Sequence, residues 1–203
     1  MKYFSIWLPS LKEREPFIKK LETDIGEPIH ICRAINGKDH VDLFRGFRHI
    51  LSSKVITPGM IGCLLSHISL LRNISENSVI FEDDCEFVGK KTDLDSYIHD
   101  LSYADILCLA TSENVDYTLV PNKEYVSITR FWGTHALRIT KKAALAIIAT
   151  FEKYYAQRIF LPADWLYSYA IKEHGLIAFA PSNPREYFDY KRNIYSAVLE
   201  RIR

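Results

Sequence analysis

The sequence has no apolar run long enough to cross a membrane and no segment typical of secretion. Its longest apolar stretches, around CLLSHISLL and AALAIIATF, are well short of the roughly 20 residues that a membrane-spanning helix needs. The apolar run at the N-terminus, in MKYFSIWLPS, is shorter still, and charged residues follow it at once. These absences predict a cytoplasmic protein.

Cysteine is sparse, and its spacing excludes the common cysteine-based frameworks. The four cysteines, Cys32, Cys63, Cys85 and Cys108, lie far apart in mostly apolar surroundings. This spacing matches neither a CxxC metal site nor a dense set of disulfides. We therefore expect reduced and buried thiols.

The sequence also lacks an excess of charge and any visible division into parts. Its 26 Lys and Arg residues balance 25 Asp and Glu residues, and the formal net charge of +1 argues against nucleic acid as a partner. No internal repeat, low-complexity tract or Gly/Ser linker separates one region from another. We predict a single domain over residues 1–203, in which residues 186–203 form a basic and aromatic C-terminal tail.

The sequence does contain a regular alternation of strand and helix patterns. Strands are expected at 2–8, 28–35, 78–81, 104–110, 135–140 and 176–180, and helices at 12–22, 57–74, 94–101, 141–155 and 164–174. Residues 119–120 and 125–129 flank a Pro-Asn-Lys turn and predict a hairpin. The pattern predicts an α/β fold: a mainly parallel twisted sheet with flanking helices and a small antiparallel portion after residue 115.

Local signals mark the boundaries of two of these helices. Thr57 stands in an N-cap position, with Pro58 as the first helical residue. Asp164 stands just before the helical run from Trp165, which is also a good N-cap position, and Gly175 ends that run.

Three consecutive acids, Glu82, Asp83 and Asp84, directly follow the apolar run VIF. Ligands of open α/β sheets bind beyond the carboxyl ends of the strands, and alternate side chains share a face, so Glu82 and Asp84 should point together. Two carboxylates about 4 Å apart repel by about 4 kcal/mol at an effective dielectric constant of 20. A shared proton, basic side chains or a bound cation would relieve this repulsion, and a divalent ion that also binds diphosphate oxygens is a common solution. A solvated acidic turn is the alternative interpretation.

The segment TPGMIGCLLSHISLLRNISENSVIFEDDCEF closely resembles the core signature of glycosyltransferase family 25, the lipooligosaccharide-type and procollagen-type galactosyltransferases. That signature runs from a Gly-x-Ile-Gly-Cys turn through Ser-His on a helix to a strand that ends in Glu-Asp-Asp. The matching residues are Gly62, Cys63, Ser66, His67, Glu82, Asp83 and Asp84. Further matches follow the order of the family and extend the resemblance over roughly residues 3–181: IWLPSLKERE, RAINGKD, GTHALRITKKAA and LPADWL.

The resemblance implies a GT-A type fold, a nucleotide-sugar donor that is usually UDP-galactose, a divalent metal such as Mn²⁺ or Mg²⁺, and inversion at the sugar carbon. We expect Asp84 and Glu82 to bind the metal. Asp164 is the expected base that accepts the proton of the acceptor hydroxyl, and Asp83 is the second candidate. The expected donor-binding residues are Leu8, Pro9, Arg14, Asn36, Gly37, His67, Gly133 and Thr134.

Several of these residues also have an ordinary structural interpretation. His67 follows Cys63 by four residues, a helical spacing that suits a metal pair, but no second pair accompanies it, so the sequence argues against zinc and a core histidine is the alternative. Arg14 could grip a diphosphate or lie solvated on a helix, and Gly133 could serve an ordinary turn. His174 could be a third metal ligand or simply end its helix.

The resemblance therefore implies a metal-dependent, inverting glycosyltransferase that extends a cell-surface or lipid-linked oligosaccharide such as lipooligosaccharide. Trp7 and Asn36 stand where the family usually has Asn and Asp, which leaves a non-catalytic sugar- or nucleotide-binding protein as the alternative. A metal-dependent phosphoesterase would need further His and Asp ligands in a recognisable set. The tail suits peripheral contact with an anionic membrane, or a surface helix packed on its own domain.

Overall fold

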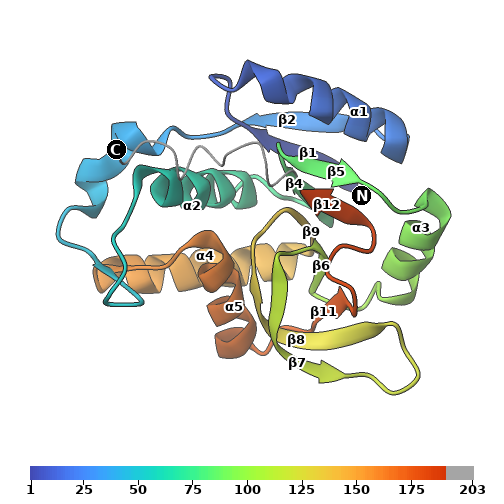
Figure 1. Cartoon of the computed structure of the whole chain (residues 1–203). Coiled ribbons are helices and arrows are strands. Elements are labelled where there is room, and N and C mark those ends of the chain that lie inside the picture. Colours follow the sequence, from blue (N-terminus) through green and yellow to red (C-terminus); the bar gives the residue numbers. More distant parts are fainter. Residues whose placement is uncertain (191–203) are drawn as a thin grey trace.

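The computed structural model describes residues 1–190, and its largest feature is an eight-stranded sheet (Figure 1). The sheet contains β1 (Lys2–Trp7), β2 (Ile29–Arg33), β4 (Ser78–Glu82), β6 (Ile106–Ala110), β7 (Glu113–Leu119), β8 (Tyr125–Trp132), β9 (Ala136–Ile139) and β11 (Ala178–Pro181), in the order β2-β1-β4-β9-β6-β11-β8-β7. Two small sheets pair β3 (Arg48–His49) with β10 (Ile159–Phe160) and β5 (Cys85–Phe87) with β12 (Phe188–Tyr190). The helices are α1 (Glu15–Ile25), α2 (Pro58–Leu71), α3 (Lys91–Asp100), α4 (Lys141–Ala156) and α5 (Ala163–His174), with the 3-10 helices η1 (Lys12–Arg14) and η2 (Gly37–Phe44).

The strand pairing brings the carboxyl ends of β4 and β6 to the same end of the sheet, which is called here the carboxyl edge. β1 pairs in parallel with β2 and β4, and β6 pairs in parallel with β11. β9 lies between β4 and β6 and is antiparallel to both, so β9 begins at the edge where they end. The predicted α/β fold is confirmed, but the insertion of an antiparallel strand into the middle of the sheet was not foreseen.

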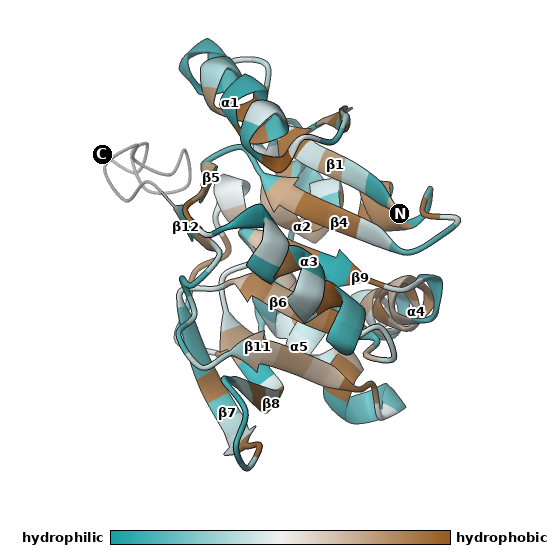
Figure 2. Ribbon diagram, turned by 90° about the vertical axis from the view of Figure 1, so that its right-hand side faces the viewer, coloured by the Kyte–Doolittle hydropathy of each residue, from teal (hydrophilic) through white to brown (hydrophobic). Residues whose placement is uncertain are grey.

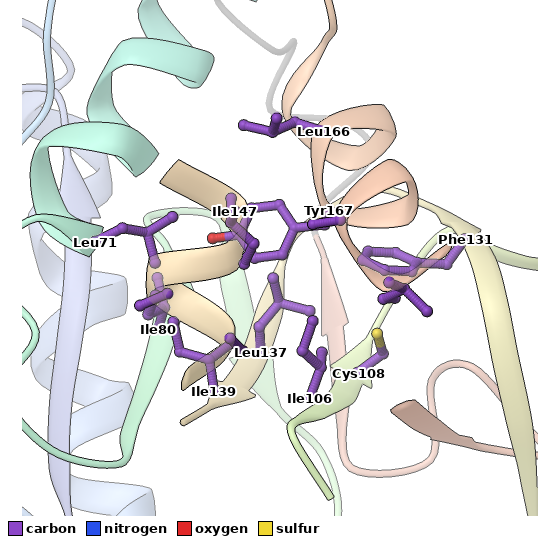
Figure 3. Packing of buried hydrophobic residues seen from close by; sticks show 14 of the residues in the cluster. Leu71, Ile80, Ile106, Cys108, Phe131, Leu137, Ile139, Ile147, Leu166 and Tyr167 are labelled. Atoms are coloured by element: carbon purple, nitrogen blue, oxygen red, sulfur yellow. The ribbon is translucent and has the colours of Figure 1, made fainter. Parts of the chain in front are cut away.

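Alternating side chains of the strands build one hydrophobic core on each face of the sheet. In β4, Ile80 belongs to the core under α2, α4 and α5, whereas Val79 and Phe81 belong to the core under α1 and α3. Figure 3 shows part of the first core, where Ile80 lies near Leu71 of α2 and Ile147 of α4. Burial of each such side chain contributes about 1.5–3 kcal/mol, so the two cores together fix the position of the strand end that follows Phe81.

The flanking helices bury one apolar face each. In α1, Ile18, Leu21 and Ile25 recur at helical spacing and are buried, and the ribbon of α1 in Figure 2 carries both hydrophobic and hydrophilic colours. The helix ends at Gly26, whose φ of 72° is readily adopted only by glycine.

The expected boundaries of α2 and the end of α5 are confirmed. Thr57 Oγ1 accepts a hydrogen bond from Met60 N at 3.3 Å, and α2 begins at Pro58. Gly175 ends α5 with a φ of 60°. Strand residues predicted at 78–81, 104–110, 135–140 and 176–180 correspond to β4, β6, β9 and β11 with small differences at the ends. The helix η2 was not predicted, because the Asn-Gly pair before it reads as a simple turn.

All four cysteines are free thiols, as the sequence predicted. Cys85 and Cys108 are buried, and Cys32 and Cys63 are half-buried. Within residues 1–190, no helix combines the length and the apolar composition needed to cross a membrane.

The first residues of the predicted C-terminal tail belong to the fold. Phe188 is fully buried and Tyr187 is 8% exposed, both in the core under α1 and α3. β12 pairs antiparallel with β5, with Phe188 opposite Phe87. The start of the predicted tail therefore packs on the domain, and the predicted contact of the tail with a membrane stays a prediction. The rest of the tail, residues 191–203, lies outside the described residues.

Candidate functional site

The three acids at the end of β4 point in two directions, as the extended chain predicts. Glu82 ends β4, and Asp83 and Asp84 form the turn into β5. Glu82 Oε2 and Asp84 Oδ1 lie 3.4 and 3.7 Å from His135 Nδ1. Asp83 instead forms an ion pair with Arg14. Glu82 and Asp84 thus share one side of the turn, and Asp83 faces the other.

Arg14 and Asp83 anchor the turn to the chain that follows β1. Both side chains are buried, and Leu8 N also donates to Asp83 Oδ2 at 3.2 Å. Burial raises the pKa of the Asp83 carboxyl, while Arg14 and the Leu8 amide oppose that rise. Arg14 Nη1 lies 3.8 Å from Asp84 Oδ2 as well. Arg14 therefore offsets the charge of two of the acids, and Leu8 and Pro9 form the adjoining turn.

The segment between β8 and β9 covers the acids from the other side. Gly133 has a φ of 80°, which only glycine readily adopts, and the chain turns there toward the site. Thr134 Oγ1 donates to Glu82 Oε1 at 2.5 Å, and Glu82 N donates to His135 O at 2.9 Å. Burial disfavours the charged form of His135, but its contacts with Asp84 and Glu82 outweigh burial and raise the pKa of His135 to about 10. Thr134 thus lies beside the acids, whereas its predicted contact with the donor stays a prediction. His135 also lies beside the acids and was not predicted.

The helix α2 also borders the acids, and it contributes Cys63 and His67. His67 is buried, with Nε2 3.4 Å from Glu82 Oε1 and Nδ1 3.0 Å from the hydroxyl of Tyr167. Cys63 Sγ donates to the same Glu82 oxygen at 3.8 Å. Burial opposes ionisation of Glu82, yet His135 and His67 hold the pKa of its carboxyl well below the usual range. Ser66 connects this helix to the segment after β2, since Ile35 N donates to Ser66 Oγ at 2.8 Å.

Asp164 lies beside this cluster, but it does not cap its helix. α5 begins at Ala163, so the predicted N-cap position is wrong by two residues: Pro162 precedes the helix, and Asp164 is inside its first turn. The Asp164 carboxylate accepts from Gly133 N at 3.2 Å and from Trp165 N at 2.9 Å. Burial raises the pKa of Asp164, and these two amide hydrogen bonds oppose the rise. Asp164 thereby connects α5 to the segment that carries His135.

Asn36 and Gly37 lie at the start of η2. Asn36 Oδ1 accepts from Lys38 N at 3.2 Å and begins that helix. A Cβ atom added to Gly37 would lie 1.7 Å from Pro58 O and 2.5 Å from Gly62 N, so only glycine allows η2 to pack on the first turn of α2. This close packing accounts for Gly37 in structural terms, whereas its predicted contact with the donor stays a prediction.

Two further residues singled out in the sequence have side-chain hydrogen bonds to partners other than the acids. His174 Nε2 is 3.2 Å from Thr150 Oγ1, where α5 packs on α4, and His174 is in neither group of potential metal ligands among the described residues. Trp7 Nε1 donates to Leu11 O at 3.2 Å and so steadies the turn that leads to Arg14.

Two overlapping sets of described side chains have ligand atoms within 4.8 Å of one another: Glu82, Asp84 and His135, and Cys63, His67 and Glu82. The first set fits a hard divalent ion, because two carboxylates and one imidazole suit Mn²⁺ and, through the carboxylates, Mg²⁺. Asp84 Oδ1 is buried and has no hydrogen bond within residues 1–190, which leaves an acceptor oxygen for such an ion.

His135 shows what the sequence alone could not supply. Its sequence context, GTHALRIT, identifies the start of a strand next to a Gly-Thr pair. Its position beside Glu82 depends on β9 pairing antiparallel with β4, with Phe81 opposite Ala136. The only available signal was its place directly after Thr134 in the matching motif.

Several solved structures are similar to this chain at low sequence identity. They include a putative glucose-1-phosphate thymidylyltransferase from Bacillus anthracis in complex with sucrose, with 13% identity, coverage of 94% of this chain and 89% of that chain, and a TM-score of 0.49. A UDP-glucose pyrophosphorylase complexed with UDP-glucose has 9% identity, coverage of 89% and 90%, and a TM-score of 0.47. The 4-diphosphocytidyl-2C-methyl-D-erythritol synthase of Anaerococcus prevotii has 15% identity, coverage of 90% of both chains, and a TM-score of 0.44.

No curated protein matches this chain in sequence. The pattern of one family, described as glycosyltransferase family 25 (LPS biosynthesis protein), matches residues 1–167. This match spans most of the chain and includes every side chain of the acidic cluster and its neighbours from Leu8 to Asp164. The protein therefore belongs to glycosyltransferase family 25.

Proposed function

We propose that the protein is a metal-dependent, inverting glycosyltransferase that moves a hexose, most simply galactose, from a UDP-sugar to a cell-surface oligosaccharide such as lipooligosaccharide. Membership of glycosyltransferase family 25 supports the reaction class. The observation that carries the proposal is the convergence of Glu82, Asp84 and His135 at the end of β4, with ligand atoms within 4.8 Å of one another. Ligands of α/β sheets bind at this kind of strand end.

In this proposal Asp84 and Glu82 hold a divalent ion, Mn²⁺ or Mg²⁺, together with His135. When bound, the ion neutralises negative charge that develops on the diphosphate as it leaves. Binding of the ion through His135 requires the imidazole to give up its proton to water, because a protonated ring nitrogen cannot be a ligand. Glu82 is held in place for this role by Thr134 and His67.

Asp164 is the proposed general base. Its carboxylate lies next to the His135 segment, through the hydrogen bond from Gly133 N at 3.2 Å. Burial raises its pKa, which makes the carboxylate a better proton acceptor. The acceptor hydroxyl oxygen forms the new bond to the anomeric carbon, its proton passes to Asp164, and the bond from that carbon to the diphosphate oxygen breaks with its electron pair on UDP.

Asp83 is less suited to this step, because its carboxylate is already engaged by Arg14 and Leu8 N. Attack from the face opposite the departing UDP inverts the sugar carbon. In an inverting reaction the acceptor attacks one face of the sugar while UDP leaves from the other. The proposed base and the proposed metal site lie on separate elements, α5 and β4, which suits such an arrangement.

The test is incubation of the purified protein with radiolabelled UDP-galactose, UDP-glucose and their N-acetylated counterparts, with and without Mn²⁺. Without an acceptor, the expected result is slow hydrolysis of one donor, only when metal is present. On addition of an oligosaccharide acceptor, that donor should be consumed faster as its sugar is transferred to the acceptor. Saturable binding of the same donors with no release under any condition would instead establish the non-catalytic binding protein.

A further inference from the structure

The side of Glu82 that faces α2 carries a second, chemically different set of side chains. Cys63 and His67 are four residues apart on α2, so they lie one turn apart on the same helix face. Their Sγ and Nε2 atoms approach the same oxygen, Glu82 Oε1, at 3.8 and 3.4 Å. The other oxygen, Oε2, faces His135 at 3.4 Å. One carboxylate therefore separates a thiol and imidazole group from the acidic group.

These separations match the edges of a tetrahedral zinc site. With zinc–sulfur bonds of about 2.3 Å and zinc–nitrogen or zinc–oxygen bonds of about 2.0–2.1 Å, a tetrahedron has a nitrogen–oxygen edge of about 3.3 Å and a sulfur–oxygen edge of about 3.6 Å. The observed edges are 3.4 Å for His67 and Glu82 and 3.8 Å for Cys63 and Glu82. These two edges are longer than the tetrahedral values by about 0.1 and 0.2 Å, and the ligand atoms of Cys63 and His67 lie within 4.8 Å of each other.

The surroundings supply the supporting contacts that metal-binding side chains need. The ring nitrogen of His67 that faces away from Glu82 is 3.0 Å from the Tyr167 hydroxyl, and Tyr167 is itself fully buried. Such a partner fixes the ring orientation and the tautomer of a metal-binding histidine. Thr134 Oγ1 steadies the carboxylate by donating to Glu82 Oε1 at 2.5 Å. The ring of His67 is thus positioned by a contact that has no bearing on the acidic group.

The thiol determines which ions this set would take. Thiolate and imidazole select Zn²⁺ and Co²⁺, whereas carboxylates serve Mn²⁺ and Mg²⁺. A metal ligand must be the thiolate, so an incoming ion would release the Cys63 thiol proton to water as the sulfur–metal bond forms. Three protein ligands leave the fourth tetrahedral position open to water.

We propose that Cys63, His67 and Glu82 form a zinc-selective site, which shares only Glu82 with the Glu82, Asp84 and His135 group. The sequence argued against zinc because it offered only one pair of ligands, and the fold supplies the third from β4. This inference concerns metal binding alone, and its test detects the bond to the Cys63 thiolate, which has no part in the proposed transfer reaction.

The test uses Co²⁺ as a coloured substitute for Zn²⁺, added to the full chain under a phosphine reductant. Co²⁺ bound to a thiolate has an intense ultraviolet charge-transfer band, and Co²⁺ bound only to oxygen and nitrogen lacks it, so the acidic group is silent in this assay. We expect the band to saturate at one equivalent, to vanish when one equivalent of Zn²⁺ is added, and to persist in the same amount of Mn²⁺.

Variants assign the band to this site. Cys63→Ser should abolish it, whereas Cys32→Ser, which changes the other half-buried cysteine, should leave it unchanged. Tyr167→Phe keeps all three ligands and should weaken Co²⁺ binding about tenfold, the lower end of the usual effect of losing such a partner. Circular dichroism confirms that each variant is folded. A band that survives Cys63→Ser, or the absence of any band in the folded parent protein, would overturn the proposal.

Discussion

Buried carboxylates occur at both ends of the parallel strands β4 and β6, and their negative charges are balanced to different degrees at the two ends. Asp105 stands just before β6, at the edge opposite the acids of β4, and is 5% exposed. Its Oδ2 accepts from Lys142 Nζ at 2.9 Å and from Ile177 N at 3.0 Å. The single negative charge of Asp105 is balanced by one cation, Lys142, and the hydrogen bond from Ile177 N connects the start of β6 to the start of β11. All of its contacts are explained by the fold.

The edge at the end of β4 gathers three carboxylates against two cations. Arg14 contacts Asp83 and Asp84, and His135 contacts Glu82 and Asp84. Asp84 Oδ1 has no hydrogen bond within residues 1–190. The same type of side chain is therefore fully satisfied at one edge and left with spare charge and a spare acceptor at the other. That surplus distinguishes a site that can bind a cation from one that only supports the fold.

The largest effect on stability is expected from a substitution that increases the surplus of negative charge at the end of β4. Arg14→Gln removes the buried cation beside Asp83, and an uncompensated buried carboxylate typically costs about 3–5 kcal/mol in the free energy of unfolding. Urea denaturation measures the loss. Mn²⁺ should restore part of the stability of this variant, because the ion replaces some of the missing positive charge.

Lys142→Ala is the matched control at the opposite edge. The Lys142 side chain is 66% exposed, so its ion pair with Asp105 is screened by solvent and its loss should cost below about 1 kcal/mol. Equal losses in the two variants would mean that the two edges do not differ in charge balance.

The second prediction separates chemistry from folding at Asp164. Asp164→Asn retains only one of the two side-chain oxygens, so it keeps one of the hydrogen bonds from Gly133 N and Trp165 N, and loss of the other should cost about 1.5–3 kcal/mol in the free energy of unfolding. The variant should still bind UDP with Mn²⁺. Its transfer rate should fall by about 100-fold or more, since an amide cannot accept the proton of the acceptor hydroxyl. Near-normal turnover would show that Asp164 only connects α5 to the His135 segment.

The third prediction concerns Asp105 itself. Asp105→Asn removes a charged acceptor from Lys142 and Ile177 N and should cost about 2 kcal/mol in the free energy of unfolding, the usual scale for a hydrogen bond to a charged group. UDP and Mn²⁺ binding, followed by calorimetry, should be unchanged. Weakened ligand binding in this variant would contradict the assignment of this edge to the fold alone.

The smallest effect on stability is expected from Asp84→Asn in the absence of ligands. The substitution relieves the repulsion from Glu82 and Asp83 but loses the attraction to His135 and Arg14, so the two changes offset each other and the melting temperature should be unchanged or slightly higher. A fall of several degrees, measured by differential scanning calorimetry, would indicate that Asp84 is a structural residue like Asp105.

The sequence predicted most strands and helices because apolar periodicity and caps are local signals. Thr57, Pro58 and Gly175 mark their helix ends through contacts within a few residues. The placement of Glu82 and Asp84 on one side followed from the geometry of an extended chain. These features required no knowledge of the neighbouring strands.

The features that the sequence missed depend on contacts between distant segments. His135 reaches the acids only because β9 inserts between β4 and β6. Phe188 is buried because β12 pairs with β5, although the basic and aromatic composition of the segment from residue 186 is typical of a surface tail. Asp164 was misplaced by two residues because the capping rule cannot tell a carboxylate that accepts from its own helix from one that also accepts from Gly133.

The most direct test of the surplus charge at the end of β4 is whether UDP and Mn²⁺ strengthen each other's binding. A thermal-shift titration of UDP with and without Mn²⁺ measures this, with Mg²⁺ and Ca²⁺ as comparisons. If the ion links Asp84 to the diphosphate, each ligand must raise the melting temperature more in the presence of the other, and Asp84→Asn must abolish this mutual enhancement. Equal UDP shifts with and without Mn²⁺ in the parent protein would contradict the account.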